Sequence, residues 1–233
     1  MPDTPRSALV TGGTGGLGAG VTAALLGAGW RVTVPWVAEA ELERVPEREG
    51  LTLVQADLSD PDAVTRAVAE AAGQEGAPLG AVVNLVGGYA AGPRVHETEL
   101  EDFEAQFALN VRPTFLVTRA ALPHLLDAGG GSIVCVGTRA ALEPFSGAAA
   151  YASSKAAVLA FVKAVAKEYR DERVRANAIL PSVIDTPANR ESMPDADFDK
   201  WPKAEQIAEV VRFLCSEDSA LISGAWVPVY GRA

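Results

Sequence analysis

Short apolar runs alternate along this chain with longer stretches in which apolar residues recur every three or four positions. The short runs predict strands at 8–10, 32–34, 51–54, 81–83, 132–136, 174–179 and 225–229. The longer stretches predict helices at 18–26, 61–72, 99–126, 151–169 and 204–215. Strands that are apolar on both faces and separated by helices are typical of a doubly wound parallel sheet. We therefore expect an α/β fold of about seven strands, in a single domain spanning 1–233.

One stretch breaks this rhythm. Residues 185–201 follow the sixth predicted strand and are rich in Pro, Asn, Ser and Asp. A loop of this length in a compact domain is usually functional or disordered, and ligands bind beyond the carboxyl ends of parallel strands. We interpret 185–201 as a substrate lid, with a plain surface loop as the alternative.

Composition limits the possible partners. Of 233 residues, 48% are hydrophobic and 21% are charged, which is typical of a globular fold. The 30 acidic and 20 basic residues give a formal charge of −10 with no basic block, so neither nucleic acid nor an anionic membrane is expected as a partner. Cys135 and Cys215 lie in apolar surroundings and predict buried side chains rather than a disulfide or a metal site. With no apolar leader and no long uncharged apolar stretch, we expect a cytoplasmic protein.

A glycine-rich run joins the first predicted strand to the first predicted helix. From Thr11 to Gly18 it spells T-G-G-T-G-G-L-G, which fits both G-x-G-x-x-G and T-G-x-x-x-G-x-G. Glycines let the backbone approach a pyrophosphate, and a helix N-terminus offers free N–H groups to it. Between a strand and a helix, this run predicts a dinucleotide-binding loop. Its expected cofactor contacts are Gly12, Thr14, Gly15, Gly16, Leu17 and Gly18.

The end of the second predicted strand bears on the choice of cofactor. An acid there favours NAD and an arginine nearby favours NADP, but this chain carries Trp36. Trp36 would either stack on adenine or act as a packing aromatic. Glu39 and Glu41 follow and would repel a 2′-phosphate. The sequence therefore predicts NAD or NADP as the cofactor, and slightly favours NAD.

Further cofactor contacts are expected after the third and fourth strands. Asp57 can accept a hydrogen bond from the adenine amino group, and Leu58 can contribute a backbone contact. Alternatively, Asp57 begins the cap of the next helix, and the two roles are compatible. Asn84, Val86 and Gly87 bring more backbone to the adenosine side of the cleft.

Tyr151 and Lys155 carry the candidate chemistry. Four residues apart on a helix, their side chains lie on one face. The pKa of a free phenol is about 10, and a nearby positive charge lowers it toward working pH. Such a pair can exchange a proton with an alcohol or a carbonyl. The spacing arises by chance for roughly one tyrosine in twenty, so its weight comes from the glycine loop.

With these elements in this order, the chain resembles the short-chain dehydrogenase/reductase family along nearly its whole length. The run at 11–18 matches that family's dinucleotide loop, and Tyr151-x-x-x-Lys155 its catalytic pair. The resemblance implies a Rossmann-like fold. It makes Thr138 the counterpart of the family's serine and Asn110 that of its active-site asparagine. By the same matching, the nicotinamide end of the cofactor would be contacted by Tyr151, Lys155, Pro181, Val183, Ile184 and Thr186.

The resemblance implies an NAD(P)-dependent oxidoreductase that transfers hydride between nicotinamide and a small carbonyl or alcohol substrate. Tyr151 would be the general acid or base, and Lys155 would lower its pKa and bind the nicotinamide ribose. Thr138 would donate a hydrogen bond to the substrate oxygen, and Asn110 would hold a proton-relaying water. Pro113 would kink the long helix beside Asn110. The family usually pairs through its long helices, so a homo-oligomer, either a dimer or a tetramer, is expected.

Two segments, at 87–92 and 185–198, resemble those of dihydropteridine reductases. That branch carries an acid at the place of Trp36 and no serine at the place of Thr138. A general carbonyl/alcohol oxidoreductase is therefore the main hypothesis, and a quinonoid dihydropteridine reductase is the alternative. A non-catalytic nucleotide-binding sensor is the third, and the complete catalytic set argues against it. The expected substrate contacts are Tyr89, His96 and Asn189.

Overall fold

Seven parallel strands form one sheet in the computed structural model, which describes residues 5–233. The strands are β1 (Ser7–Thr11), β2 (Arg31–Trp36), β3 (Leu51–Gln55), β4 (Leu79–Asn84), β5 (Gly131–Val136), β6 (Val174–Pro181) and β7 (Trp226–Val229). Their spatial order is β3-β2-β1-β4-β5-β6-β7, so the direction of winding reverses between β1 and β4. The expected doubly wound sheet is confirmed, and its switch point is where such folds bind ligands.

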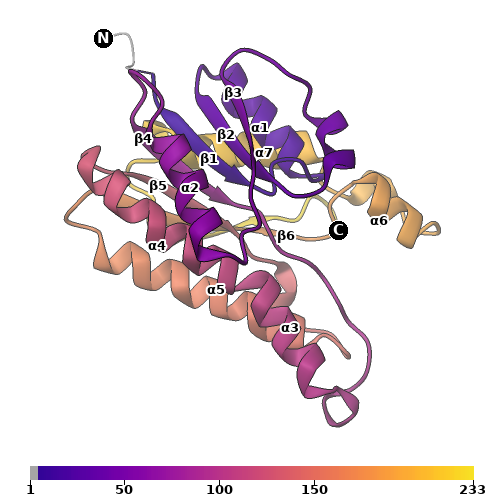
Figure 1. Cartoon of the computed structure of the whole chain (residues 1–233). Coiled ribbons are helices and arrows are strands. Elements are labelled where there is room, and N and C mark those ends of the chain that lie inside the picture. Colours follow the sequence, from indigo (N-terminus) through magenta and orange to yellow (C-terminus); the bar gives the residue numbers. More distant parts are fainter. Residues whose placement is uncertain (1–4) are drawn as a thin grey trace.

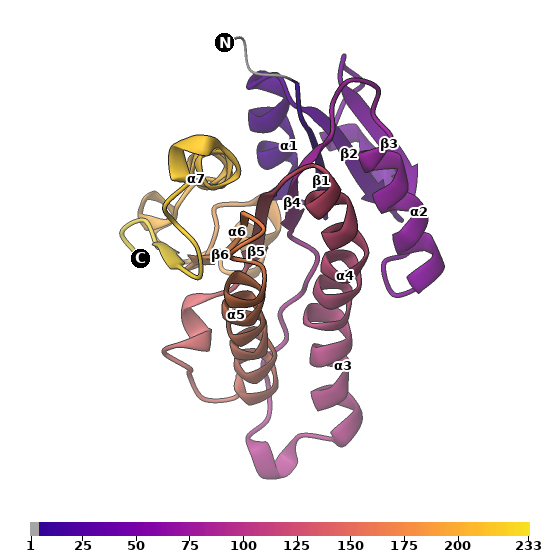
Figure 2. The ribbon, with the colours of Figure 1, turned by 90° about the vertical axis from the view of Figure 1, so that its left-hand side faces the viewer.

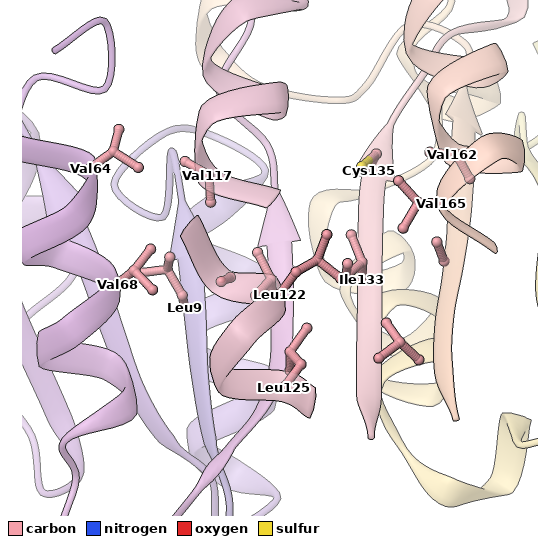
Figure 3. Packing of buried hydrophobic residues seen from close by; sticks show 14 of the residues in the cluster. Leu9, Val64, Val68, Val117, Leu122, Leu125, Ile133, Cys135, Val162 and Val165 are labelled. Atoms are coloured by element: carbon pink, nitrogen blue, oxygen red, sulfur yellow. The ribbon is translucent and has the colours of Figure 1, made fainter. Parts of the chain in front are cut away.

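Helices cover both faces of the sheet (Figures 1 and 2). One face carries α2 (Pro61–Ala72), α4 (Arg112–Asp127) and α5 (Ala149–Glu168), and the other carries α1 (Gly18–Gly27) and α7 (Ala204–Cys215). Side chains alternate between the two faces along a strand. Accordingly, Leu9 lies in the core beneath α2 and α4, whereas Ala8 and Val10 pack beneath α1 and α7. Figure 3 shows Leu9 against Val68 in the first of these cores.

The long helix expected over 99–126 is divided in two. α3 (Leu100–Asn110) ends at Asn110 and α4 begins at Arg112, with Val111 between them. Pro113 stands in the first turn of α4 and has no N–H to donate to the preceding turn, which accounts for the break. The expected kink is therefore confirmed as an interruption, and it falls immediately after Asn110.

The segment 185–201, expected to form a substrate lid and called the lid below, is more ordered than its composition suggests. It contains a short helix, α6 (Pro187–Ser192), and a 3-10 turn at Phe198–Lys200. The hydroxyl of Thr186 accepts from the Asn189 backbone N–H and caps α6, with Pro187 in its first turn. The Arg190 guanidinium holds both carboxylate oxygens of Asp185, at 2.6 and 2.9 Å. The expectation of a wholly irregular stretch is wrong because this local capping suffices to form a helical turn.

Helix α5 has 20 residues and is long and apolar enough to cross a membrane by composition. It is also the central helix of the core, because Val158, Leu159 and Val162 are buried against the sheet. We therefore interpret α5 as a core helix. Cys135 and Cys215 are both buried and free of a disulfide, as expected.

Candidate active site

The glycine-rich loop makes a cradle that side chains would fill. Gly12 has φ of +66°, a conformation that glycine adopts without strain, and a Cβ there would lie 3.1 Å from the backbone nitrogen of Val86. A Cβ on Gly18 would overlap the carbonyl oxygen of Gly12. Helix α1 begins at Gly18 with no side-chain cap. The loop therefore presents bare backbone and a helix N-terminus, which is the arrangement that a pyrophosphate needs.

The lid reaches this loop. A Cβ on Gly16 would meet the Cγ2 methyl of Thr186 at 2.9 Å, so the cap of α6 lies against the dinucleotide loop. Pro181 ends β6, and Val183 and Ile184 are half-buried in the turn that leads from it to Thr186. These residues lie beyond the carboxyl end of β6, where the matching with the family places nicotinamide contacts.

A latch between the glycine loop and the segment after β2 was not anticipated from the sequence. The Thr14 hydroxyl donates to Glu41 Oε2 at 2.7 Å. Arg44 Nη1 donates both to the Thr14 carbonyl oxygen and to Glu41 Oε1, each at 3.3 Å. Glu41 was noted only for its charge, and Arg44 was missed because this pairing spans about thirty residues with no local signal.

Three of the residues expected on the adenosine side of the cofactor lie at or just beyond the ends of β2 and β3. Trp36 is half-buried at the end of β2, and Asp57 is exposed beyond β3, with Leu58 buried beside it. Asp57 Oδ1 accepts from the backbone N–H of Ser59 at 2.8 Å, a hydrogen bond that lowers the pKa of Asp57. Asp57 therefore orders the turn just before α2, whose N-cap is Asp60 rather than Asp57, and the expected contact of Asp57 with adenine stays a prediction.

The side chain of Asn84 is buried, and Nδ2 lies 3.2 Å from Thr118 Oγ1 and 3.7 Å from Cys135 Sγ. The side chain therefore fastens β4 to α4 and β5. The backbone contact with the cofactor that is expected of Asn84, Val86 and Gly87 stays a prediction.

Lys155 lies inside the protein with 4% of its surface exposed, and its Nζ donates to the Val136 carbonyl oxygen at 3.1 Å. Burial lowers its pKa from 10.5 to about 8 because desolvation disfavours the ammonium. A Cβ on Gly87 would come within 2.9 Å of Lys155 Nζ and 2.6 Å of Asn110 Oδ1. Glycine is therefore required there to bring Lys155 and Asn110 together.

Asn110 is fully buried and held at both ends of its amide. Oδ1 accepts from the Gly88 backbone N–H at 3.0 Å, and Nδ2 donates to Ser154 Oγ at 3.1 Å. Ser154 in turn donates to the Tyr151 carbonyl oxygen at 2.8 Å, which ties the amide to the catalytic helix. Sequence reasoning missed Ser154, although its place one residue before Lys155 in α5 was a usable signal.

Tyr151 and Thr138 are brought together, as expected. Burial raises the pKa of the Tyr151 phenol, a hydrogen bond with Thr138 lowers it, and the nearby Tyr89 phenol raises it. The expected lowering of this pKa by Lys155 is wrong for the arrangement seen. The physical reason is that desolvation dominates, while the Lys155 ammonium is turned toward the Val136 carbonyl.

The residues expected to touch substrate are distributed unevenly. The Tyr89 ring meets the Tyr151 ring edge-on with centroids 5.0 Å apart, and Phe145 lies 6.4 Å from Tyr89. Phe145 is half-exposed and was not identified from the sequence. Asn189 Nδ2 donates to the Ile184 carbonyl oxygen at 2.8 Å, so its side chain braces the lid. His96 is exposed in a 3-10 turn, 3.7 Å from Glu97, with no described contact to the catalytic set in residues 5–233.

A glycine cradle at the switch point of a parallel sheet, with a buried lysine and a phenol–hydroxyl pair beside it, defines a dinucleotide-dependent oxidoreductase. The comparison with known families then identifies the chain. The family model described as short chain dehydrogenase matches residues 6–197, and the chain belongs to that family.

Similar proteins span nearly the whole chain. It is 34% identical to 2-(R)-hydroxypropyl-CoM dehydrogenase from Xanthobacter autotrophicus, over 94% of this chain and 95% of that protein. A 3-ketoacyl-(acyl-carrier-protein) reductase from Brucella melitensis, solved with NADH, superposes with a TM-score of 0.86 at 29% identity over 97% of this chain and 98% of that one. A blue fluorescent protein from a metagenomic library, solved with NADPH, superposes with a TM-score of 0.85 at 29% identity over 98% of this chain and 97% of that one.

These findings establish an NAD(P)-dependent oxidoreductase with a nicotinamide cofactor. They set aside the non-catalytic sensor, since relatives that are 31–34% identical over nearly the whole chain are named as dehydrogenases and reductases. The likeness of the lid to dihydropteridine reductases finds no counterpart in the relatives named here and stays a prediction.

Proposed function

We propose that this enzyme interconverts a small carbonyl compound and its alcohol, with Tyr151 as the general acid or base. The observation that carries the proposal is the proximity of the Tyr151 phenol to the Thr138 hydroxyl, which lowers the pKa of Tyr151, beside the glycine cradle. Two hydroxyl groups that converge in this way can hold one substrate oxygen between them. The glycine loop and Thr186 fit a nicotinamide dinucleotide, which when bound supplies or accepts the hydride.

Each side chain has a role that follows from its surroundings. Tyr151 gives a proton to, or takes one from, the substrate oxygen, and Thr138 donates a hydrogen bond to the same oxygen. The pKa of Lys155, about 8, lies near the operating pH. Lys155 can therefore exchange a proton with groups in the protein interior. Asn110, clamped by Gly88 and Ser154, keeps the space beside Lys155 open for a proton relay.

Turnover assays of two variants test this assignment. Tyr151→Phe should lose at least about a thousandfold in kcat on a panel of small ketones and alcohols, because the proton donor is gone. Its affinity for the cofactor, followed by nucleotide fluorescence, should stay within about threefold because the cradle is intact. Thr138→Ser should retain most activity while Thr138→Ala loses it. Full ketone turnover by Tyr151→Phe would refute the proton-transfer role.

We also infer a preference for NAD over NADP. Glu41 supports it, because the carboxylate is fixed on Thr14 beside the glycine loop and would repel a 2′-phosphate. Glu41→Gln keeps a hydrogen-bond acceptor for Thr14 and removes the charge. The ratio of kcat/KM for NADPH over NADH should then rise about tenfold, equivalent to about 1.4 kcal/mol. Glu39→Gln is the matched control, and equal shifts in both variants would contradict the inference.

Self-association is a further part of the proposal. Phe115 and Leu126 on α4 are 46% and 37% exposed, and Phe115 packs edge-on against Phe161 of α5 with centroids 6.1 Å apart. Apolar side chains exposed along α4, with the half-buried Phe161 of α5 beside them, support a homo-oligomer formed through α4 and α5. Sedimentation of Phe115→Glu should show a smaller species than the parent protein, and an unchanged mass would contradict this surface.

A further inference from the structure

A hollow of about 720 Å³ lies at the opposite end of the sheet from the active site. It opens beside the first residues of β1, β5 and β6, whereas the glycine loop and lid lie beyond the strands' carboxyl ends. β6 has eight residues, so about 23 Å of extended chain separates the two ends. The hollow is lined by Arg6, Gly129, Gly130, Gly131, Arg170, Arg173, Val174, Arg175, Cys215, Glu217, Ala220, Leu221 and Ser223.

Four arginines and one carboxylate make this lining strongly positive. Arg6 pairs with that carboxylate, Glu217, at 3.4 Å. Within residues 5–233, Arg170, Arg173 and Arg175 take part in no ion pair. A net positive hollow is unexpected in a chain whose formal charge is −10. General charge balance therefore does not explain this concentration of guanidinium groups.

Arg175 fixes one of these charges in a partly buried position. Its Nη1 donates to the carbonyl oxygens of Leu214 and Ile222 at 3.1 and 3.4 Å, and Nη2 donates to that of Ser216 at 3.0 Å. These acceptors are neutral, so they orient the guanidinium without neutralising it. A partly buried cation of this kind raises the potential of the hollow that it lines.

Arg173 reaches the hollow at a conformational cost. Its φ is +61°, and within residues 5–233 it is the one non-glycine residue with a positive φ. The turn is held by the Arg173 N–H donating to the Arg170 carbonyl and by the Gly131 N–H donating to the Arg173 carbonyl, both at 3.2 Å. Glycine would occupy this position without strain. An arginine there places a charge at the hollow, and strained positions of this kind concentrate at functional sites.

We propose that this arginine-lined hollow binds a phosphorylated small molecule. Guanidinium forks match the oxygens of a phosphate group, and those of Arg170 and Arg173, beside the fixed charge of Arg175, suit a diphosphate better than a single carboxylate. The volume falls within the range of small-molecule sites. Leu221, wholly exposed at the rim, offers apolar contact to an organic portion of the ligand. A long polyanion such as nucleic acid would be repelled by the acidic remainder of the surface.

Isothermal titration with inorganic pyrophosphate tests the proposal on the full chain at low salt. The cofactor is kept saturating, so that the glycine loop cannot take up the probe. We expect saturable binding of one pyrophosphate per chain. The double variant Arg170→Ala/Arg173→Ala should raise Kd at least about tenfold, because two charge-assisted contacts are removed. Arg66→Ala, which removes an equally exposed arginine from α2, should leave Kd within about twofold.

A second variant separates lost binding from lost folding. Arg173→Gly removes the side chain but relieves the positive φ, so its melting temperature should equal or exceed that of Arg173→Ala while pyrophosphate binding falls in both. Adenosine diphosphate should bind more tightly than pyrophosphate if the apolar rim is used. Binding that vanishes when the cofactor is saturating, or that weakens equally in Arg66→Ala, would overturn the proposal. So would the absence of saturable binding to any phosphate probe.

Discussion

Replacing the buried lysine by an isosteric apolar residue, Lys155→Met, should stabilise the fold while removing its catalytic function. Burial lowers the pKa of Lys155 from 10.5 to about 8. That difference corresponds to about 3 kcal/mol by which keeping the ammonium buried disfavours the fold at neutral pH. The variant also loses the hydrogen bond to the Val136 carbonyl oxygen, and a bond from a charged donor contributes about 1.5–3 kcal/mol. The net expectation at pH 7 is a gain of about 1 kcal/mol.

The pH dependence of that gain gives a sharper test than its size. A lysine whose pKa is depressed in the folded state binds fewer protons there than in the unfolded chain. The stability of the parent protein therefore rises with pH from about 8 toward 10.5. Between pH 7 and pH 9 this rise in stability amounts to about 1 kcal/mol. Methionine does not titrate, so the advantage of the variant should shrink by that amount.

Urea unfolding at pH 7, 8 and 9, followed by circular dichroism with linear extrapolation, measures the difference between the two proteins. Burial raises the pKa of the Cys135 and Cys215 thiols to about 11 and about 12, which weakens the fold as pH rises. Both thiols are present in both proteins, so their effect largely cancels in the comparison. A stability difference that stays constant from pH 7 to pH 9 would refute the desolvation of Lys155.

Three further outcomes are expected. Gly18→Ala should weaken nucleotide binding at least about tenfold in a fluorescence titration, because the added Cβ would overlap the Gly12 carbonyl and reshape the loop. An unchanged affinity would contradict the role of the glycine loop as a pyrophosphate cradle. Thr138→Ala should lower kcat by about 10²–10³ in ketone reduction, and a loss confined to KM would argue against a bond that strengthens in the transition state. The Asp60 carboxylate caps α2 by accepting from the Asp62 N–H at 3.0 Å. Asp60→Ala removes this cap and should lower the free energy of unfolding, measured in urea, by about 1 kcal/mol.

Most of the fold could be predicted from the sequence because it is specified locally. Apolar runs bounded by turn residues placed all seven strands, and Asp60 and Pro61 marked the start of α2 at its observed residue. The helix in the lid was missed even though Thr186 and Pro187 form a capping signal, because the surrounding polar composition was given more weight.

The remaining features depend on tertiary contacts and left no local signal. The latch between Thr14 and Glu41 joins segments 27 residues apart. Burial is the main influence on the pKa values of Lys155 and Tyr151. This could not be predicted, because it depends on how closely Gly87 and Tyr89 approach them, and sequence spacing does not give that distance. Phe145 was overlooked because an isolated aromatic in a loop has no periodicity by which to recognise it.

Helix α5 carries Tyr151, Ser154 and Lys155 and buries one side against the sheet, whereas Tyr89 and Phe145 stand on loops. In the proposed function, the chemistry and the choice of substrate are thus encoded in separable parts of the chain. Mutations in the loops can change the substrate without disturbing the alignment of the proton donor. Changes along α5, by contrast, also affect the stability of the fold and are therefore selected against. A scaffold divided in this way is well suited to diversification, since the helix that carries the chemistry can stay unchanged while the loops vary.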